Sequence, residues 1–285
     1  MKLYIIMTMC MINALFFSCN TTSSSQKTPK LKLLWETDTI FKTSESCLYD
    51  PKHHVIYVSN VNNAPRTKDN NGFISLLHTD GSVIKLKWAT GMSAPKGMGY
   101  FNEVLYVTDI DAVLEIDAHT GEIIDKHVLE GALMLNDIAI DALGTVYVSA
   151  MDTHKIYKLI DGDFILWKDH LNSPNGLNVL GNNLLVASAG DGTLKAFDIT
   201  TKKEVKHLAS NLGRADGVVS LKSGNHLVSD WRGEIFHIGD SITSLYNTVK
   251  NDKLQSADIG NIPNKNIILV PTFFGNSVKA FKLTE

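Results

Sequence analysis

The chain has 285 residues, of which 44% are hydrophobic, so it is long enough to bury one large core. Its 27 basic and 30 acidic side chains give a formal net charge of -3, and no basic run or stripe occurs along it. This charge pattern argues against a nucleic-acid partner, which would be bound through clustered positive charge.

The first 18 residues differ in composition from the rest of the chain. After one lysine, an apolar run extends from Leu3 to Phe17; it is short for a membrane span and typical of a secretory signal. Its end resembles a bacterial lipoprotein signal, in which a small residue, here Ser18, precedes a cysteine, here Cys19, that is lipidated after cleavage. Phe16 and Phe17 depart from the usual pattern, and an ordinary signal peptide that contains Cys19 is the alternative.

Residues 19–30 are rich in Thr and Ser and are predicted to form a flexible tether. Cleavage before Cys19 would leave the protein in the cell envelope, most naturally at a bacterial outer membrane, with the lipid anchor as its one membrane contact. Cys47 would then be the one cysteine of the folded domain, which excludes a disulfide within the fold. We expect it to be a buried small residue.

From residue 45 onward one plan recurs along the chain. A polar residue opens an apolar run, a turn follows, a second run ends in Ser, Thr or Asp in most copies, and a third run comes next. The opening residues are Glu45, Lys96, Asn136, Asn175, Asp216 and Asp258. Subtracting successive positions from Lys96 onward gives intervals of 40, 39, 41 and 42 residues, the period of a four-stranded propeller blade. The sequence therefore predicts an all-β fold, a six-bladed β-propeller over residues 31–285.

The two ends of this domain are predicted to meet. The sixth repeat lacks a fourth strand, whereas residues 31–36 form a strand-like run that belongs to no repeat. We predict that this run supplies the outer strand of the sixth blade and closes the ring, which removes an exposed sheet edge.

The loops that follow the second strands should gather on one face of the ring. In a propeller these loops lie on the same face as the residues that open the first strands. The long insertion at residues 60–72 of the first repeat should therefore overhang the opening residues. The same argument brings eight further side chains to that face: Asp109, Asp152, His154, Asp191, Trp231, Arg232, Phe273 and Phe274.

The opening residues should also converge, because equivalent positions in a ring of blades point at its central axis. Glu45, Asn136, Asn175 and Asp216 supply two carboxylates and two amide oxygens, with Asp258 as a further candidate. Such hard oxygen ligands suit Ca²⁺ or another divalent cation better than Zn²⁺. Asn-Gly and Asp-Gly, found at two of these positions, are also ordinary turn dipeptides. Because all of these residues occupy the same position in their repeats, a shared cation site is favoured over a set of turn residues.

The pattern resembles the senescence-marker-protein/gluconolactonase family of six-bladed propellers over residues 31–285. The matching pieces are Glu45 with Leu48-Tyr49-Asp50, Leu135-Asn136-Asp137, Ser173-Pro174-Asn175-Gly176-Leu177 and Ala215-Asp216-Gly217. The resemblance implies one divalent cation, usually calcium, at the bottom of a central pocket, where it serves the hydrolysis of lactones or phosphoesters. The residues implied as its ligands are Glu45, Asn136, Asn175 and Asp216.

Two departures from the family pattern affect the expected substrate and backbone. Ser46 and Cys47 replace the glycine and proline that usually follow the first glutamate. Met134 stands where gluconolactonase-like members carry an arginine that contacts sugar substrates. The second departure weakens the case for gluconate-type substrates, so the metal site is better supported than any particular substrate.

The expected activity is calcium-dependent hydrolysis of a small lactone or ester by a monomeric protein. Asp216 is expected to act as a ligand and as a general base, because a carboxylate beside the metal can reach the attacking water. Asp258 is the second candidate base, with a turn residue as its alternative role. The expected pocket residues are Trp231, Phe273, His154 and Asp109, although such aromatic side chains also pack between blades. A non-enzymatic propeller that binds a ligand or protein around a structural metal is the alternative function.

Overall fold

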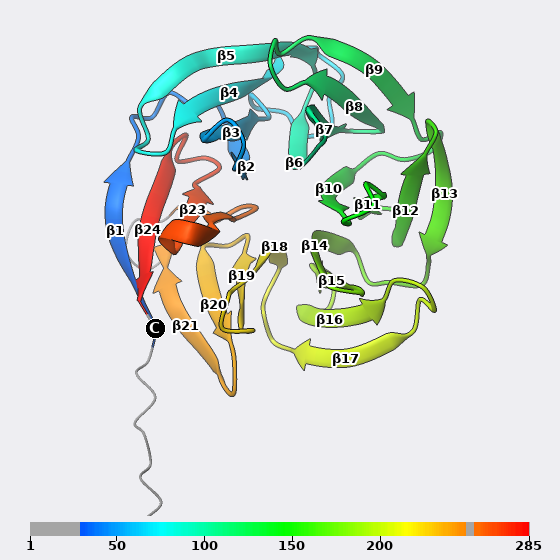
Figure 1. Cartoon of the computed structure of the whole chain (residues 1–285), viewed down its shortest axis with the longest axis vertical. Coiled ribbons are helices and arrows are strands. Elements are labelled where there is room, and N and C mark those ends of the chain that lie inside the picture. The colour runs from blue at the N-terminus through cyan, green and yellow to red at the C-terminus, as the bar shows by residue number, and fades with distance from the viewer. Residues whose placement is uncertain (1–28, 249–253, 285) are drawn as a thin grey trace, which may run out of the picture.

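The computed structural model describes residues 29–248 and 254–284, so the predicted lipidation site at Cys19 lies outside the described residues. The chain forms six four-stranded antiparallel sheets arranged in a ring (Figure 1). The six-bladed propeller predicted from the repeat period is confirmed. Within the described residues, none of the helical structure has the length and apolar composition that a membrane span needs.

Each of the first five blades consists of four consecutive strands that pair in chain order. Blade one contains β2 (Ser44–Asp50), β3 (Val55–Asn60), β4 (Gly72–His78) and β5 (Val83–Met92). Blade two contains β6 (Pro95–Phe101), β7 (Val104–Asp109), β8 (Ala112–Asp117) and β9 (Ile123–Val128). Blade three contains β10 (Leu135–Ile140), β11 (Val146–Ala150), β12 (Lys155–Ile160) and β13 (Asp163–Lys168).

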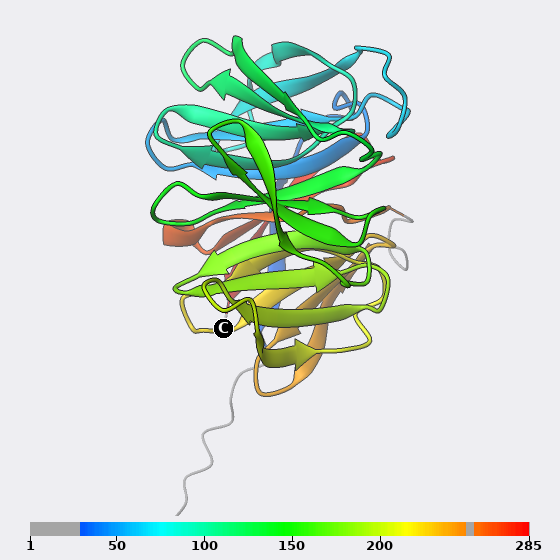
Figure 2. The same ribbon diagram turned by 90° about the vertical axis from the view of Figure 1, so that its right-hand side faces the viewer.

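The next two blades repeat this order, and strands β2, β6, β10, β14 and β18 line the centre of the ring (Figure 1). Blade four contains β14 (Pro174–Leu180), β15 (Asn183–Ser188), β16 (Thr193–Asp198) and β17 (Glu204–Ala209). Blade five contains β18 (Ala215–Ser220), β19 (His226–Asp230), β20 (Glu234–Ile238) and β21 (Ile242–Asn247). Seen from the side, the strands run from one face of the ring to the other (Figure 2).

The sixth blade joins the two ends of the domain. It contains β22 (Gly260–Ile262), β23 (Ile267–Pro271), β24 (Val278–Thr284) and β1 (Lys30–Glu36), with the 3₁₀ turn η1 (Pro263–Lys265) between β22 and β23. β1 pairs antiparallel with β24, and Leu33 lies opposite Phe281. The predicted closure of the ring by residues 31–36 is confirmed, and it covers the edge that β24 would otherwise expose.

Apolar side chains from adjacent blades fill the space between them. In one cluster Tyr57 and Ile74 of blade one pack with Met98 and Leu105 of blade two, and all four are buried. Cys47 is a buried free cysteine in the cluster between blades one and six, as expected. This packing holds the inner strands in fixed positions around the axis.

A β-bulge interrupts the inner strand of each of the first five blades at the same place. In β2 the pairing with β3 shifts between Ser44 and Cys47, and the equivalent shift occurs in β6, β10, β14 and β18. Each bulge contains the residue that opens the repeat and the residue after it. A bulge sets two successive residues against one partner residue. In blades one and three the two residues consequently line cavities on different sides of the ring.

Buried serines on the second strands accept hydrogen bonds from the amides that the bulges free. The amide of Ser46 donates to Ser59 Oγ at 2.9 Å, and the amide of Asp137 donates to Ser149 Oγ at 2.8 Å. The same bond recurs in blade five. A buried amide without a partner is costly. The serine near the end of these second runs therefore supports the geometry of the inner strand.

Candidate functional site

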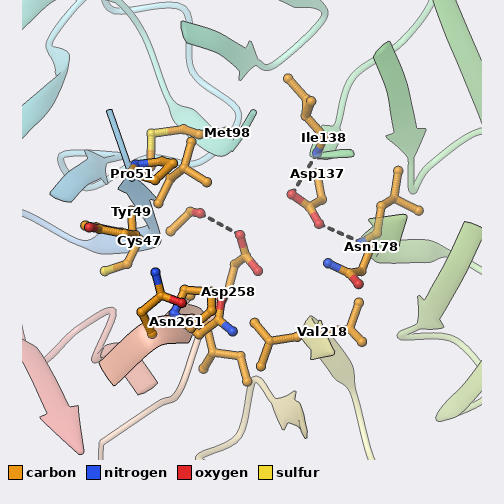
Figure 3. Close-up of a pocket in the computed structure, with 18 residues that line it drawn as sticks. Cys47, Tyr49, Pro51, Met98, Asp137, Ile138, Asn178, Val218, Asp258 and Asn261 are labelled. Carbon is orange, nitrogen blue, oxygen red and sulfur yellow. Dashed lines mark hydrogen bonds between the residues drawn. The ribbon is translucent and has the colours of Figure 1, made fainter. Parts of the chain in front are cut away.

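A cavity lies on each side of the inner strands at the centre of the ring. The loop-side cavity, of about 290 Å³, has at its floor the residues that open the first five repeats, and loops from the same face form its walls. The hairpin-side cavity, of about 340 Å³, is lined by residues further along the inner strands, such as Asp137, and by Asp258, which precedes β22 (Figure 3).

The floor of the loop-side cavity is polar and almost completely buried. The side chains that meet there are Glu45, Lys96, Asn136, Asn175 and Asp216, each belonging to a residue that is no more than 5% exposed. They come from five different blades but from the same position in each repeat. The structure therefore brings together all four of the predicted metal ligands.

Three oxygens at this floor have no hydrogen-bond partner among the described residues. They are Glu45 Oε2, Asn136 Oδ1 and Asn175 Oδ1. The amide nitrogens have partners, since Asn136 Nδ2 contacts Met151 Sδ at 3.0 Å and Asn175 Nδ2 donates to Asp216 Oδ1 at 2.9 Å. Buried oxygens without a partner are rare and costly, so this floor is chemically incomplete without a further donor or cation.

The unpaired oxygens fit a hard divalent cation. Within the described parts of the chain, no group of three or more His, Cys, Asp or Glu side chains is arranged to hold a metal. A cation here would therefore depend on the amide oxygens of Asn136 and Asn175 as well as on the carboxylates of Glu45 and Asp216. Amide and carboxylate oxygens, completed by water, form the ligand set that Ca²⁺ accepts.

The electrostatics of the floor disfavour two negative charges. Burial raises the pKa of Glu45 well above its ordinary value, and the charge of Asp216 raises it further. Burial also raises the pKa of Asp216, and the charge of Asp258 adds to this, whereas the hydrogen bond from Asn175 lowers it. A cation beside these carboxylates would act in the opposite direction and favour their ionised forms.

Lys96 adds a positive charge that the sequence analysis did not assign to the site. It is 1% exposed, and its Nζ donates to the carbonyl oxygen of Ala94 at 2.9 Å. Burial lowers the pKa of Lys96, and the negative charge of Glu45 opposes that shift. The repeat already placed Lys96 on the axis, so its phase was the signal for its position. A search for metal ligands passes over it because an ammonium group cannot ligate.

Aromatic side chains form one wall of the loop-side cavity. Trp231, Phe273 and Phe274 line it, with ring centroids 5.7 Å apart for Trp231 and Phe273 and 4.8 Å apart for the two phenylalanines. Phe274 is 60% exposed. The rings meet edge to face, a favourable arrangement for aromatic pairs.

Two residues predicted to face the pocket lie outside its lining. His154 is exposed, and its Nδ1 accepts a hydrogen bond from the amide of Ser173 at 3.0 Å. The carboxylate of Asp109 is buried and accepts hydrogen bonds from the amides of Ser93 at 2.8 Å and Ala94 at 2.6 Å. Both side chains hold loop backbones in place, and neither lines the loop-side cavity.

Asp258 lines the hairpin-side cavity (Figure 3), whereas the four predicted ligands line the loop-side cavity. Its amide donates to the carbonyl oxygen of Glu45 at 2.9 Å, and its Oδ2 accepts a hydrogen bond from Ser46 Oγ at 2.5 Å. Asp137 lies in the same cavity and accepts a hydrogen bond from the amide of Leu177 at 2.6 Å. Burial raises the pKa of Asp258 to about 7.

The insertion between β3 and β4 overhangs the loop-side cavity, as the propeller topology predicts. Pro65 lines the cavity, and the Arg66 guanidinium contacts Met134 Sδ at 3.1 Å. Lys68 of the same insertion forms an ion pair with Asp111. The insertion thus places an arginine at the cavity rim.

Solved structures with the same fold include bacterial enzymes. A catalytically inactive variant of virginiamycin B lyase from Staphylococcus aureus, solved with quinupristin, matches 90% of this chain and 100% of its own with a TM-score of 0.62 at 11% identity. A selenomethionine-substituted virginiamycin B lyase from the same organism gives a TM-score of 0.65 at 12% identity, with 90% of this chain and 100% of that chain covered. A streptogramin B lyase gives 0.65 at 11% identity, over 90% and 98% of the two chains.

At such low identity these matches show the propeller fold alone. The chain matches no protein-family model and no curated protein sequence.

Proposed function

We propose that this protein is a metal-dependent hydrolase of lactones or other carboxylic esters, with calcium or another divalent cation at the floor of the loop-side cavity. The observation that carries the proposal is the set of three buried, unpartnered oxygens of Glu45, Asn136 and Asn175 next to the Asp216 carboxylate. The neighbours that share the fold are enzymes, which supports an enzymatic role but does not transfer their chemistry.

The four residues would divide two tasks between them. Glu45, Asn136, Asn175 and Asp216 would hold the cation, which when bound would supply a Lewis acid for a carbonyl oxygen. Asp216 Oδ1 already accepts a hydrogen bond from Asn175, and no described residue bonds to its Oδ2. That second oxygen could accept a proton from a water molecule.

The cavity above the floor favours an enzyme over a structural metal plug. A volume of about 290 Å³ leaves room for a small molecule directly above the proposed ligands. A plug would be covered by protein on this side. The proposed location is the cell envelope through lipidation of Cys19, which lies outside the described residues.

The first test measures cation binding and hydrolysis in parallel on the purified protein. After metal is removed with a chelator and the chelator is exchanged out, the melting temperature is followed as calcium is added, and lactones and aryl esters are assayed. We expect calcium to raise both the melting temperature and the rate of hydrolysis. Stabilisation without hydrolysis would support the non-enzymatic binding propeller, and no response to any divalent cation would refute both forms of the metal site.

The substitution Asp216→Asn tests whether Asp216 acts as the general base without disturbing the fold. It preserves the shape of the side chain but removes its charge and basicity, so we expect kcat to fall by about 100-fold or more, with little change in melting temperature of the metal-free protein. Asp240→Asn, an exposed aspartate of the same blade between β20 and β21, is the matched control and should leave kcat unchanged. Wild-type turnover by Asp216→Asn would exclude Asp216 as the base.

A further inference from the structure

Arg214 is a cation at the mouth of the loop-side cavity that the proposed chemistry does not use. It lies immediately before β18, lines the cavity, and is exposed. Its guanidinium carbon is 5.3 Å from the ring centroid of Trp231, a cation–π contact. Its backbone amide donates to Asp230 Oδ1 at 3.0 Å. These contacts hold the planar group against the aromatic wall.

The guanidinium of Arg214 has no hydrogen-bond or ion-pair partner among the described residues, in contrast to its neighbour Arg232. The nearby carboxylate of Asp230 is already engaged, because Arg232 Nη2 donates to its Oδ2 at 2.7 Å and Arg232 Nε donates to its Oδ1 at 3.1 Å. Arg214 therefore presents its N–H donors to the solvent at the cavity mouth. A planar fork of donors matches the two oxygens of a carboxylate.

The surroundings of Arg214 combine a positive charge with apolar surface. Trp231 makes a cation–π contact with Arg214 and also meets Phe273 and Phe274 edge to face. A ligand whose anionic end lies on the guanidinium would therefore place an adjoining apolar group against these rings. These rings line the same cavity as the polar floor, where the proposed reaction would take place.

The unpaired positive charge at the cavity mouth matches a monoanion. Arg214 lines the cavity without an anionic partner among the described residues, whereas the neighbouring Asp230 carboxylate is paired with Arg232. One guanidinium balances one negative charge, so a carboxylate fits this position, whereas a phosphate dianion would keep one uncompensated charge.

We propose that the substrate of the loop-side cavity carries a carboxylate, which Arg214 binds at the mouth while an adjoining apolar group packs on Trp231 and Phe273. The substrate class is thus a carboxylate-bearing ester or lactone. This inference rests on the proposed hydrolase function for the reaction, but the recognition of the carboxylate can be measured without it. Arg214 is a specificity-determining residue, with no part in bond breaking.

Binding is tested by calorimetry with benzoate, which combines a carboxylate with an aromatic ring and cannot be hydrolysed. On the metal-free protein we expect Arg214→Gln to weaken benzoate binding by about tenfold, the loss of one charge-assisted contact. Lys206→Gln removes the same charge from an exposed position of β17 outside the cavity, and it should leave the affinity unchanged. Equal weakening by the two variants, or no benzoate binding at all, would overturn the proposal. Tighter binding of phenyl phosphate than of benzoate would overturn the choice of a carboxylate.

Turnover then distinguishes this inference from the proposed function. Phenyl acetate and 4-acetoxybenzoate differ by one carboxylate, and we expect Arg214→Gln to raise KM for the anionic ester about tenfold with kcat unchanged and to leave the neutral ester unaffected. Benzoate binding that depends on Arg214, without hydrolysis of either ester, would uphold carboxylate recognition and reject the hydrolase. Hydrolysis of both esters with KM unaffected by Arg214→Gln would uphold the hydrolase and reject carboxylate recognition by Arg214.

Discussion

The floor of the loop-side cavity contains both the oxygens that would hold a cation and an ammonium group that repels one. Lys96 and Glu45 each influence the other's charge, and Lys96 lowers the pKa of Glu45 while burial raises it. Lys96 therefore supplies part of the positive charge that the carboxylates lack without a metal. A bound divalent cation would have to coexist with this ammonium group in a buried, low-dielectric site, where like charges repel strongly.

Replacing Lys96 with methionine should strengthen cation binding. The substitution Lys96→Met keeps the length of the side chain but removes the repulsion, so we expect calcium to bind at least about tenfold more tightly. Isothermal titration calorimetry on the metal-free protein measures this directly. Lys126→Met, at an exposed position of β9 in the same blade, controls for the change in net charge. Unchanged or weaker calcium binding by Lys96→Met would show that the ammonium does not oppose the cation.

At the scale of the strands, three of the five inner bulges contain a residue without a side chain. The second bulge residue is glycine in β6, β14 and β18. At Gly176 a Cβ atom would lie 1.9 Å from the backbone oxygen of Asp216 in the next blade. Backbone atoms cannot move aside as the end of a long side chain can. These glycines thus allow adjacent inner strands to approach closely enough for their opening residues to share one floor.

The substitution Gly176→Ala should therefore be far more damaging than a glycine replacement in open space. We expect it to lower the free energy of unfolding by about 3 kcal/mol or more, because the inner strands of blades four and five must separate. Gly181→Ala is the control: its Cβ would meet nothing within 4 Å, and the cost is about 1 kcal/mol for its positive φ. Urea denaturation of both variants measures the difference. Equal losses would mean that blade spacing tolerates a methyl group.

The sequence predicts the strands and the closed ring better than it predicts which side chains line the loop-side cavity and which line the hairpin-side cavity. The repeat period and the polar opening residues follow from local patterns, and so does the lone strand-like run at residues 31–36 that closes the ring. Asp258 has the same phase as Asp216 in its repeat, yet it pairs with Ser46 in a parallel bridge and lines the hairpin-side cavity. Which cavity Asp258 lines depends on how blade six packs against blade one. That packing includes the hydrogen bond between Ser46 and Asp258, which are 212 positions apart in the sequence.

Arg214 illustrates a second limit of local patterns. It precedes a predicted strand by one residue and has no motif of its own. Its proposed role depends on Trp231, which makes a cation–π contact with it, and on Arg232, which forms an ion pair with the Asp230 carboxylate. Those contacts depend on the hairpin of blade five and the angle at which its loops approach the axis. The position of a residue within its repeat identifies the residues on the axis. The residues at the rim of the cavity can be identified only from the three-dimensional structure.

For the whole molecule, ring closure concentrates buried acid at the centre. Glu45, Asp137, Asp216 and Asp258 come from blades one, three, five and six, and burial raises the pKa of each above its ordinary value. Asp258 also raises the pKa of the other three through its negative charge. In the unfolded chain these four carboxyl groups are far apart and solvated. The folded metal-free protein therefore holds protons that the unfolded chain releases at the same pH.

This difference predicts that the metal-free protein loses stability as the pH rises. A carboxyl group with a raised folded-state pKa stabilises the fold fully below its unfolded pKa, and that contribution is lost as the pH rises through the folded pKa. For Asp258 the window runs from its ordinary value of 3.8 to about 7, and the loss is on the order of 4 kcal/mol at most. Urea denaturation between pH 5 and pH 8 should show the free energy of unfolding falling in the absence of metal.

Calcium and one substitution test the origin of this pH dependence. A cation at the floor favours the ionised carboxylates, so saturating calcium should flatten the decline. Asp258→Asn mimics the protonated side chain and keeps an oxygen to accept the hydrogen bond from Ser46, so the metal-free variant should lose less stability between pH 5 and pH 8 than the wild type. Asp240→Asn, which removes an exposed carboxylate, should retain the wild-type slope. A slope that neither calcium nor Asp258→Asn reduces would mean that the buried carboxyl groups are not its source.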